Sequence, residues 1–128
     1  MAAKSNYLNN AILNAVLRNT TYTSPAAVYV ALYTVAPTAS TAGTEVAGGD
    51  YARTAVTFGA PSLGVVANSA PVAFPEAAAP WGDVVACGIF NDPTAGNLLY
   101  FGNLGTHKNV GIGDQVNFAT SALSCTET

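Results

Sequence analysis

The chain has 128 residues, of which 50% are hydrophobic and only 9% are charged, and its formal net charge is −3. Soluble domains usually carry about 25% charged residues, so this deficit predicts a protein that buries surface against copies of itself and neighbouring subunits. The four basic residues are scattered and cannot line a nucleic-acid backbone, and no apolar run approaches the roughly 18 residues of a membrane span. We therefore expect neither nucleic acid nor a membrane as a partner.

The length fits a single domain over residues 1–128, because a chain of this size buries about two thirds of its unfolded surface around one core. The N-terminus lacks a charged segment followed by a hydrophobic stretch and a small-residue cleavage site, so no secretory signal is predicted. We expect a protein that is made in a cytoplasm and stays soluble.

Residues 5–18 predict an amphipathic helix, with Ser5 as its N-cap and Arg18 at its C-terminal end. Their spacing places the hydrophobic residues on one face. These residues are Leu8, Ile12, Leu13, Val16 and Leu17. The other face carries Asn9, Asn10 and Asn14, which are polar but uncharged. Such a face suits contact with another protein, so these three asparagines are candidate interface residues.

The pattern changes to a period of two at Val28, which indicates a strand over residues 28–34 that is covered on both faces. Residues 37–49 follow as a loop of small residues, whose length and glycine content predict mobility. Thr38, Thr41 and Thr44 lie in this loop, and we take them as further candidate contacts that order on binding.

The rest of the chain reads as short strands separated by turns. The expected strands are 51–58, 65–67, 72–74, 83–91, 98–104 and 115–119, and residues 122–125 are expected to extend or cross the last of these. Strands 83–91 and 98–104 form the clearest hairpin, around the turn-rich loop between them. The fold class is therefore mainly β: an antiparallel sandwich or partly closed barrel of about seven short strands over residues 26–125, with the helix on one edge or end.

Groups that could perform catalysis are scarce. His107 lies in an expected connection between strands, and the seven acids stand apart from one another without the alternating spacing of a calcium loop. Cys87 and Cys125 do not form a disulfide framework and read as small buried hydrophobic residues. We expect no catalytic, cofactor-binding or metal-binding residues.

The aromatic residues have two interpretations. Tyr29, Tyr33, Tyr51 and Tyr100 fall in expected strands, where cross-strand packing explains them. Trp81, between a proline and a glycine at a strand entrance, is the best aromatic candidate for an interface anchor, although core packing is the preferred interpretation.

Several segments, taken in order, resemble a phage sequence pattern. They are Tyr7–Leu13, Val28–Thr34, Thr44–Arg53 (Thr-Glu-Val-Ala-Gly-Gly-Asp-Tyr-Ala-Arg), Phe74-Pro75, Trp81-Gly82, Gly88-Ile89-Phe90, Gly96–Gly102 (Gly-Asn-Leu-Leu-Tyr-Phe-Gly) and Gly113-Asp114. Over about residues 7–124 the chain resembles a family of small virion proteins of tailed phages, labelled tail-fibre, structural or capsid cement proteins. The resemblance implies a virion protein, adds no catalytic residues and implies affinity gained through many repeated contacts.

Three functions remain open at this point. The leading one is a capsid cement or decoration protein, a homotrimer on the capsid exterior that bridges major capsid subunits. It is favoured by the small size, the low charge and the lack of fibrous repeats. The second is a structural or adhesin module of a tail fibre or baseplate. The third is a small carbohydrate-acting enzyme, which the lack of paired acids disfavours.

Overall fold

The computed structural model describes residues 3–127, and this part of the chain forms one α-helix and ten β-strands. In chain order the elements are β1 (Ala3–Lys4), α1 (Asn6–Leu17), β2 (Val28–Val35), β3 (Thr44–Glu45), β4 (Thr54–Val56), β5 (Val65–Ala67), β6 (Val72–Ala73), β7 (Gly82–Phe90), β8 (Leu98–Val110), β9 (Asn117–Phe118) and β10 (Ser124–Thr126).

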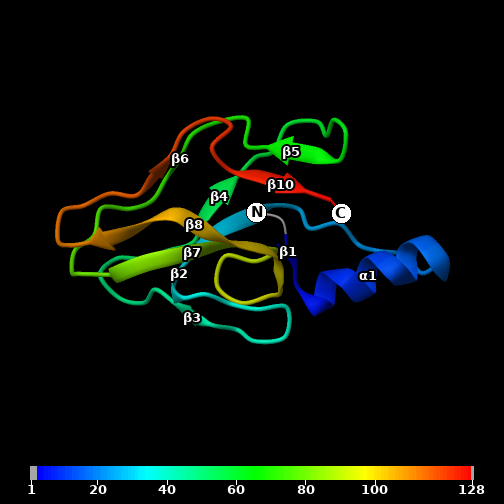
Figure 1. The fold of residues 1–128 in the computed structure, drawn as a ribbon, viewed down its shortest axis with the longest axis horizontal. Coiled ribbons are helices and arrows are strands. Elements are labelled where there is room, and N and C mark those ends of the chain that lie inside the picture. The colour runs from blue at the N-terminus through cyan, green and yellow to red at the C-terminus, as the bar shows by residue number, and fades with distance from the viewer. Residues whose placement is uncertain (1–2, 128) are drawn as a thin grey trace.

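The strands form one large sheet and two small ones, and every pairing is antiparallel. The large sheet has the order β1-β8-β7-β2-β3, and β4 pairs with β2 beside β3. The small sheets, β5–β10 and β6–β9, lie over one face of the large sheet (Figure 1). The predicted mainly β, sandwich-like fold is confirmed, and the sheet does not close into a barrel. The predicted β7–β8 hairpin is also confirmed.

The main core lies between the large sheet and the two small sheets. Val30 and Leu32 of β2 are fully buried on this side, and both cysteines lie in the same core as free thiols. The next residues of β2, Ala31 and Tyr33, are also buried, in a smaller cluster on the opposite face. The predicted burial of β2 on both faces is therefore confirmed.

Two expected strand boundaries are wrong. β8 does not end at residue 104 but continues to Val110, so His107 lies in a strand and not in a connection. Pairing resumes beyond a bulge, in which residues 104–107 of β8 stand opposite only Val85 of β7. The strand expected from residue 51 begins only at Thr54, because residues 48–50 all have positive φ angles that turn the chain before it.

The loop over residues 37–49 is more structured than its composition suggests. Thr44 and Glu45 form β3 on the edge of β2, and the backbone N–H of Val46 donates to the carbonyl of Leu32 at 2.9 Å. Val46 itself is buried in the main core. The exposed residues of this segment are therefore 38–44 and the pair 47–48, on either side of the anchored Glu45 and Val46.

Candidate protein-interaction site

Helix α1 is fixed to the domain at its first turn. The N–H of Ser5 donates to the carbonyl of Leu99 in β8 at 2.9 Å, and the N–H of Asn6 donates to the carbonyl of Ala39 at 2.9 Å. Ser5 is the N-cap, as predicted: its Oγ accepts from the N–H of Leu8 at 3.2 Å. The direction in which α1 leaves the sheet is therefore set by this anchored turn.

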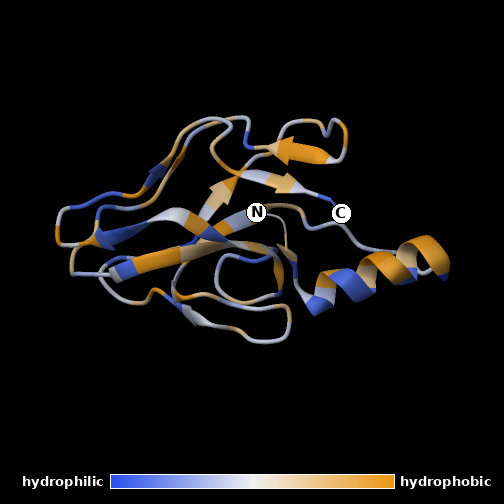
Figure 2. Cartoon of the chain, in the orientation of Figure 1, coloured by the Kyte–Doolittle hydropathy of each residue, from blue (hydrophilic) through white to orange (hydrophobic). Residues whose placement is uncertain are grey.

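The outer half of α1 extends away from the domain (Figure 1). Leu13 is 54% exposed, Val16 73% and Leu17 74%. Figure 2 shows the hydrophobic colour concentrated toward this free end of the helix. The helix sequence, from Asn6 to Leu17, contains no charged residue. We call Leu13, Val16 and Leu17 the helix tip.

The five hydrophobic residues that were predicted to share one face of the helix are covered by the domain only in part. Leu8 is buried and Ile12 packs against the core, whereas the helix tip is exposed. Adjacent helical residues lie about 100° apart, so one narrow contact with the domain cannot cover both Ile12 and Leu13. Leu13 instead follows Asn9 at the i+4 spacing that places residues on the same face.

The three candidate asparagines therefore lie in two different surroundings. Asn9 and Asn10 lie within one turn of Leu13 and border the helix tip, and Asn10 is exposed. The side-chain oxygen of Asn14 instead accepts from the guanidinium of Arg18 at 3.2 Å, at the end of the helix.

The candidate threonines lie at the other end of α1. The hydroxyls of Thr38 and Thr41 are 2.6 Å apart, and the backbone N–H of Thr41 donates to the Thr38 hydroxyl at 3.0 Å. This small turn contains Ala39, whose carbonyl receives the N–H of Asn6. Thr44 is exposed in β3. The structure thus joins the threonine turn to the base of the helix.

Trp81 does not lie on the surface. It is only 5% exposed, its indole N–H donates to the carbonyl of Gly49 at 2.9 Å, and its ring meets Tyr51 edge-on at 5.4 Å. The core-packing interpretation is the one that the structure supports, and Trp81 offers little area to a partner.

A second arrangement, which the sequence reasoning missed, surrounds Arg53. Its Nε and Nη2 donate to the two carboxylate oxygens of Glu45 at 2.9 and 2.8 Å, while Nη1 donates to the carbonyls of Asp92 and Ala95 at 3.0 and 2.7 Å. The guanidinium carbon lies 3.6 Å from the centre of the Phe90 ring. Arg53 therefore joins the β3 edge to the loop between β7 and β8.

Tyr51 extends this cluster into the sheet. Its hydroxyl donates to Glu45 at 2.6 Å and accepts from the N–H of Leu32 at 3.0 Å. Burial acts to raise the pKa of Glu45, but the hydrogen bonds from Arg53 and Tyr51 and the arginine charge lower it below its usual value. Burial and the bond to Glu45 raise the pKa of Tyr51. The carboxylate is thus held in its charged form.

Most residues of this cluster belong to the phage sequence pattern. The segment Thr44–Arg53 supplies Glu45, Tyr51 and Arg53, and a later segment supplies Phe90. The positive φ angles at residues 48–50 fold the segment back on itself, which brings Glu45 and Arg53 together. This part of the sequence pattern therefore has a structural role, and the glycine pair before Asp50 is the local signal that could have predicted the turn.

An apolar pocket of about 320 Å³ opens beside the C-terminal strand. Its lining comes from five strands and the segments beside them, and includes Val28, Val66, Ile89, Leu99 and Cys125. Glu127 is its one acidic lining residue. We call it the β10 pocket.

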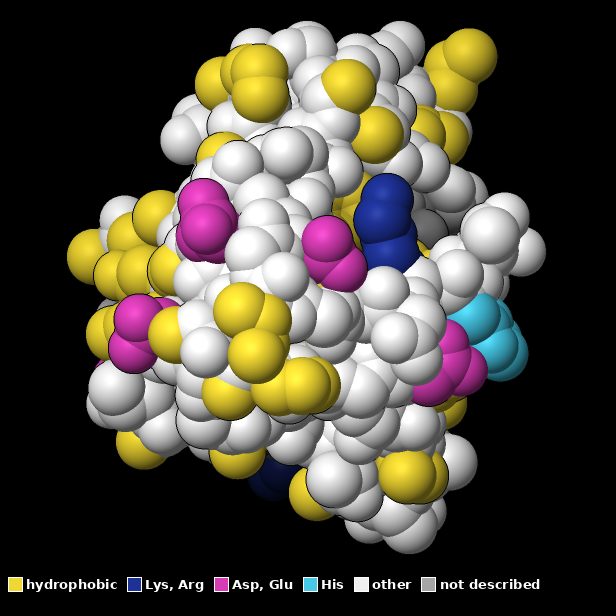
Figure 3. Space-filling view, turned by 90° about the vertical axis from the view of Figure 1, so that its left-hand side faces the viewer, with side chains coloured by type: hydrophobic (Ala, Val, Ile, Leu, Met, Phe, Trp, Pro, Cys, Tyr) yellow, Lys and Arg dark blue, Asp and Glu magenta, His cyan; other side chains and the backbone are white. Residues whose placement is uncertain are grey.

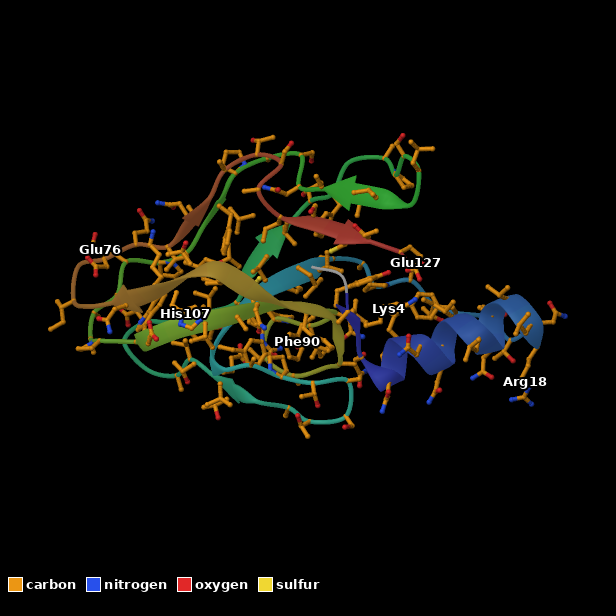
Figure 4. The ribbon with its side chains drawn as sticks, viewed as in Figure 1. Lys4, Arg18, Glu76, Phe90, His107 and Glu127 are labelled. Carbon is orange, nitrogen blue, oxygen red and sulfur yellow. The ribbon has the colours of Figure 1, made fainter. Side chains whose placement is uncertain are left out.

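Glu127 also ties the two ends of the described chain together. Its carboxylate is paired with Lys4 of β1 and accepts from the hydroxyl of Tyr100 at 2.7 Å. Figure 4 shows Lys4 and Glu127 near the base of α1, whereas Arg18 lies at its far end. These bonds lower the pKa of Glu127.

The opposite end of the molecule carries several acidic side chains. Figure 3 shows them scattered among small hydrophobic groups, with the histidine beside an acidic side chain. His107 lies 3.6 Å from Asp83, and both side chains are more than half exposed. Within residues 3–127 no three metal-ligating side chains gather, and no helix there is long and apolar enough to cross a membrane.

The comparison with known proteins gives one family. No curated protein shows a significant match to the sequence. A family model described as podophage GP4 fiber I protein gp80 matches residues 3–126, which is nearly the whole chain. This match confirms the resemblance to tailed-phage virion proteins. The chain therefore belongs to the gp80 family of podophage fibre I proteins, a family of structural proteins of the phage particle.

Proposed function

We propose that the chain is a non-catalytic structural subunit of a podophage tail fibre, which joins copies of itself and neighbouring virion proteins. The observation that carries this proposal is the projecting outer half of α1, whose hydrophobic residues the domain leaves uncovered. A surface helix without charges on its exposed face is typical of a segment that is covered in an assembly.

The tail-fibre assignment replaces the capsid cement hypothesis as the leading one. Small size and low charge favour a virion subunit without distinguishing the shell from the tail. The family description names a fibre protein, and this supports the tail. A fibre subunit needs surfaces for neighbours on more than one side, and the helix tip and the threonine turn lie at opposite ends of α1.

The uses of the charged groups support a non-catalytic role. Glu45 and Arg53 are bonded to each other, and Glu127 is bonded to Lys4. The Asp92 carboxylate accepts from the N–H groups of its own turn at residues 94 and 95. These groups hold the fold together. A general base, in contrast, must be free to accept a proton from a substrate that lies within hydrogen-bond distance of it.

The proposal is tested by separating phage particles into filled heads and tails and measuring the protein in each fraction by quantitative mass spectrometry. We expect it in the tail fraction, at a constant ratio to the other fibre proteins. Recovery with the heads, at a ratio fixed to the major capsid protein, would support the cement function and overturn the fibre assignment.

A further inference from the structure

Among the apolar features that the described residues leave uncovered are the helix tip and the β10 pocket. We propose that the helix tip of one copy packs into the β10 pocket of a second copy, an inference that rests on the proposed structural role. The same contact, repeated in the other direction, would close a symmetric assembly.

The helix tip cannot reach the β10 pocket of its own chain. The first turn of α1 is anchored to β8, and a helix of 12 residues spans about 18 Å from that anchor. Glu127, which lines the pocket, lies near the base of α1, whereas Arg18 marks its far end (Figure 4). The helix tip and the β10 pocket of one chain therefore cannot contact each other, whereas a second copy offers a pocket to the tip and a tip to the pocket.

The two surfaces match in size. The pocket volume is about 320 Å³, and a cavity of about 150 Å³ holds a molecule the size of benzene. The pocket therefore has room for about two side chains. Leu13 and Leu17 lie one helical turn apart on the same side of α1, so they enter such a pocket together.

The two surfaces also match in charge. The helix contributes no charged residue between Asn6 and Leu17, so docking desolvates no charge of the tip. Glu127 is the one acidic residue of the pocket, and Arg18 directly follows the tip. The Glu127 carboxylate is already paired with Lys4 and accepts from Tyr100. Insertion of Leu17 would therefore add Arg18 as a second cation at this rim and would leave no buried charge unpaired.

Symmetry strengthens the contact. In a two-fold pair each helix enters the pocket of the other subunit, so every favourable interaction occurs twice and no tip remains exposed. A modest apolar area per contact therefore suffices.

The test is sedimentation velocity and native mass spectrometry of the full chain. The wild type is expected to associate. L13Q/L17Q replaces the two leucines of the helix tip with glutamine, which is polar and also a good helix former. It should weaken association by at least about 100-fold, since two central apolar anchors are lost. V66F, which fills the pocket, should do the same. The matched control is I112S. Ile112 is 72% exposed and lies in the turn that bonds to Ala77, next to Glu76 at the opposite end of the molecule from α1 (Figure 4), so I112S should associate like the wild type.

A mixing experiment distinguishes packing of the helix tip into the β10 pocket from a contact between the helix tips of two copies. L13Q/L17Q keeps an intact pocket and V66F an intact tip, so the mixture should form a mixed pair although neither variant pairs alone. A monomeric wild type, or association unaffected by L13Q/L17Q or by V66F, would overturn the inference. Tail location, measured as above, does not depend on this result, so the inference can fail while the proposed function stands.

Discussion

Replacing Arg53 by alanine should destabilise the fold severely. The substitution removes both bonds to the Glu45 carboxylate and both bonds to the loop carbonyls of Asp92 and Ala95. It also uncovers the Phe90 ring. The side chain of Arg53 is 9% exposed and that of Glu45 26% exposed, so water replaces these interactions only in part.

The magnitude follows from this burial. Removing one partner of a buried ion pair costs about 3–5 kcal/mol. Glu45 keeps the hydroxyl of Tyr51 and some exposure, so the lower end, about 3 kcal/mol, applies. A domain of this size is stable by about 5–15 kcal/mol, and with a urea dependence of about 2 kcal/mol per molar the unfolding midpoint should fall by about 1.5 M.

Urea unfolding at pH 7, followed by the fluorescence of the single buried Trp81, measures this loss. Arg18 provides the matched control, because its recorded side-chain bond is one exposed contact to Asn14. R18A should change stability by less than about 0.5 kcal/mol. If R53A and R18A shift the midpoint equally, the cluster around Arg53 does not support the fold and this reasoning is refuted.

Three further predictions follow from the same contacts. The pKa of Glu45 in the fold lies below its unfolded value of 4.5, so the stability that its ion pair contributes is present above pH 4.5 and is lost as the pH falls below it. The urea midpoints of wild type and R53A should therefore converge in acid. A difference that stays constant with pH would contradict this. G49A should cost about 2–4 kcal/mol in urea unfolding, because its φ is +59° and the new Cβ would lie 2.8 Å from the carbonyl oxygen of Ala79, whereas G105A, with no atom within 4 Å, should be neutral. N68A should cost about 3 kcal/mol by the same assay, because this buried side chain bonds two carbonyls and one N–H; a loss below about 1 kcal/mol would show that the site relaxes.

The strands and the anchored start of the helix could be predicted from local sequence. The alternation in β2 and β7 reports burial directly, and the Ser5 cap is a short-range signal. These features depend on residues close in sequence, where periodicity is informative. The β7–β8 hairpin could be predicted for the same reason.

Apart from the turn at the glycine pair before Asp50, the site depends on contacts between segments that local patterns do not encode. Hydrophobic spacing predicted that Leu13 and Leu17 share a face with Leu8, but spacing does not tell how much of that face the domain covers. Likewise Arg53 appeared as an isolated cation, because its partners at residues 92 and 95 lie about 40 positions away. The extent of β8 was missed because a bulge over residues 104–107 separates the two paired parts of the strand, and pairing resumes only at Lys108.

We propose above that this protein is a fibre subunit that acts through its projecting helix. Cryo-electron microscopy of the whole particle tests it most directly, because the sandwich with one protruding helix is a shape that can be fitted to density. We expect the domain in the tail fibre, with α1 covered by a neighbouring subunit. Density for the domain on the capsid shell, or a domain in the fibre whose α1 is exposed to solvent, would contradict it.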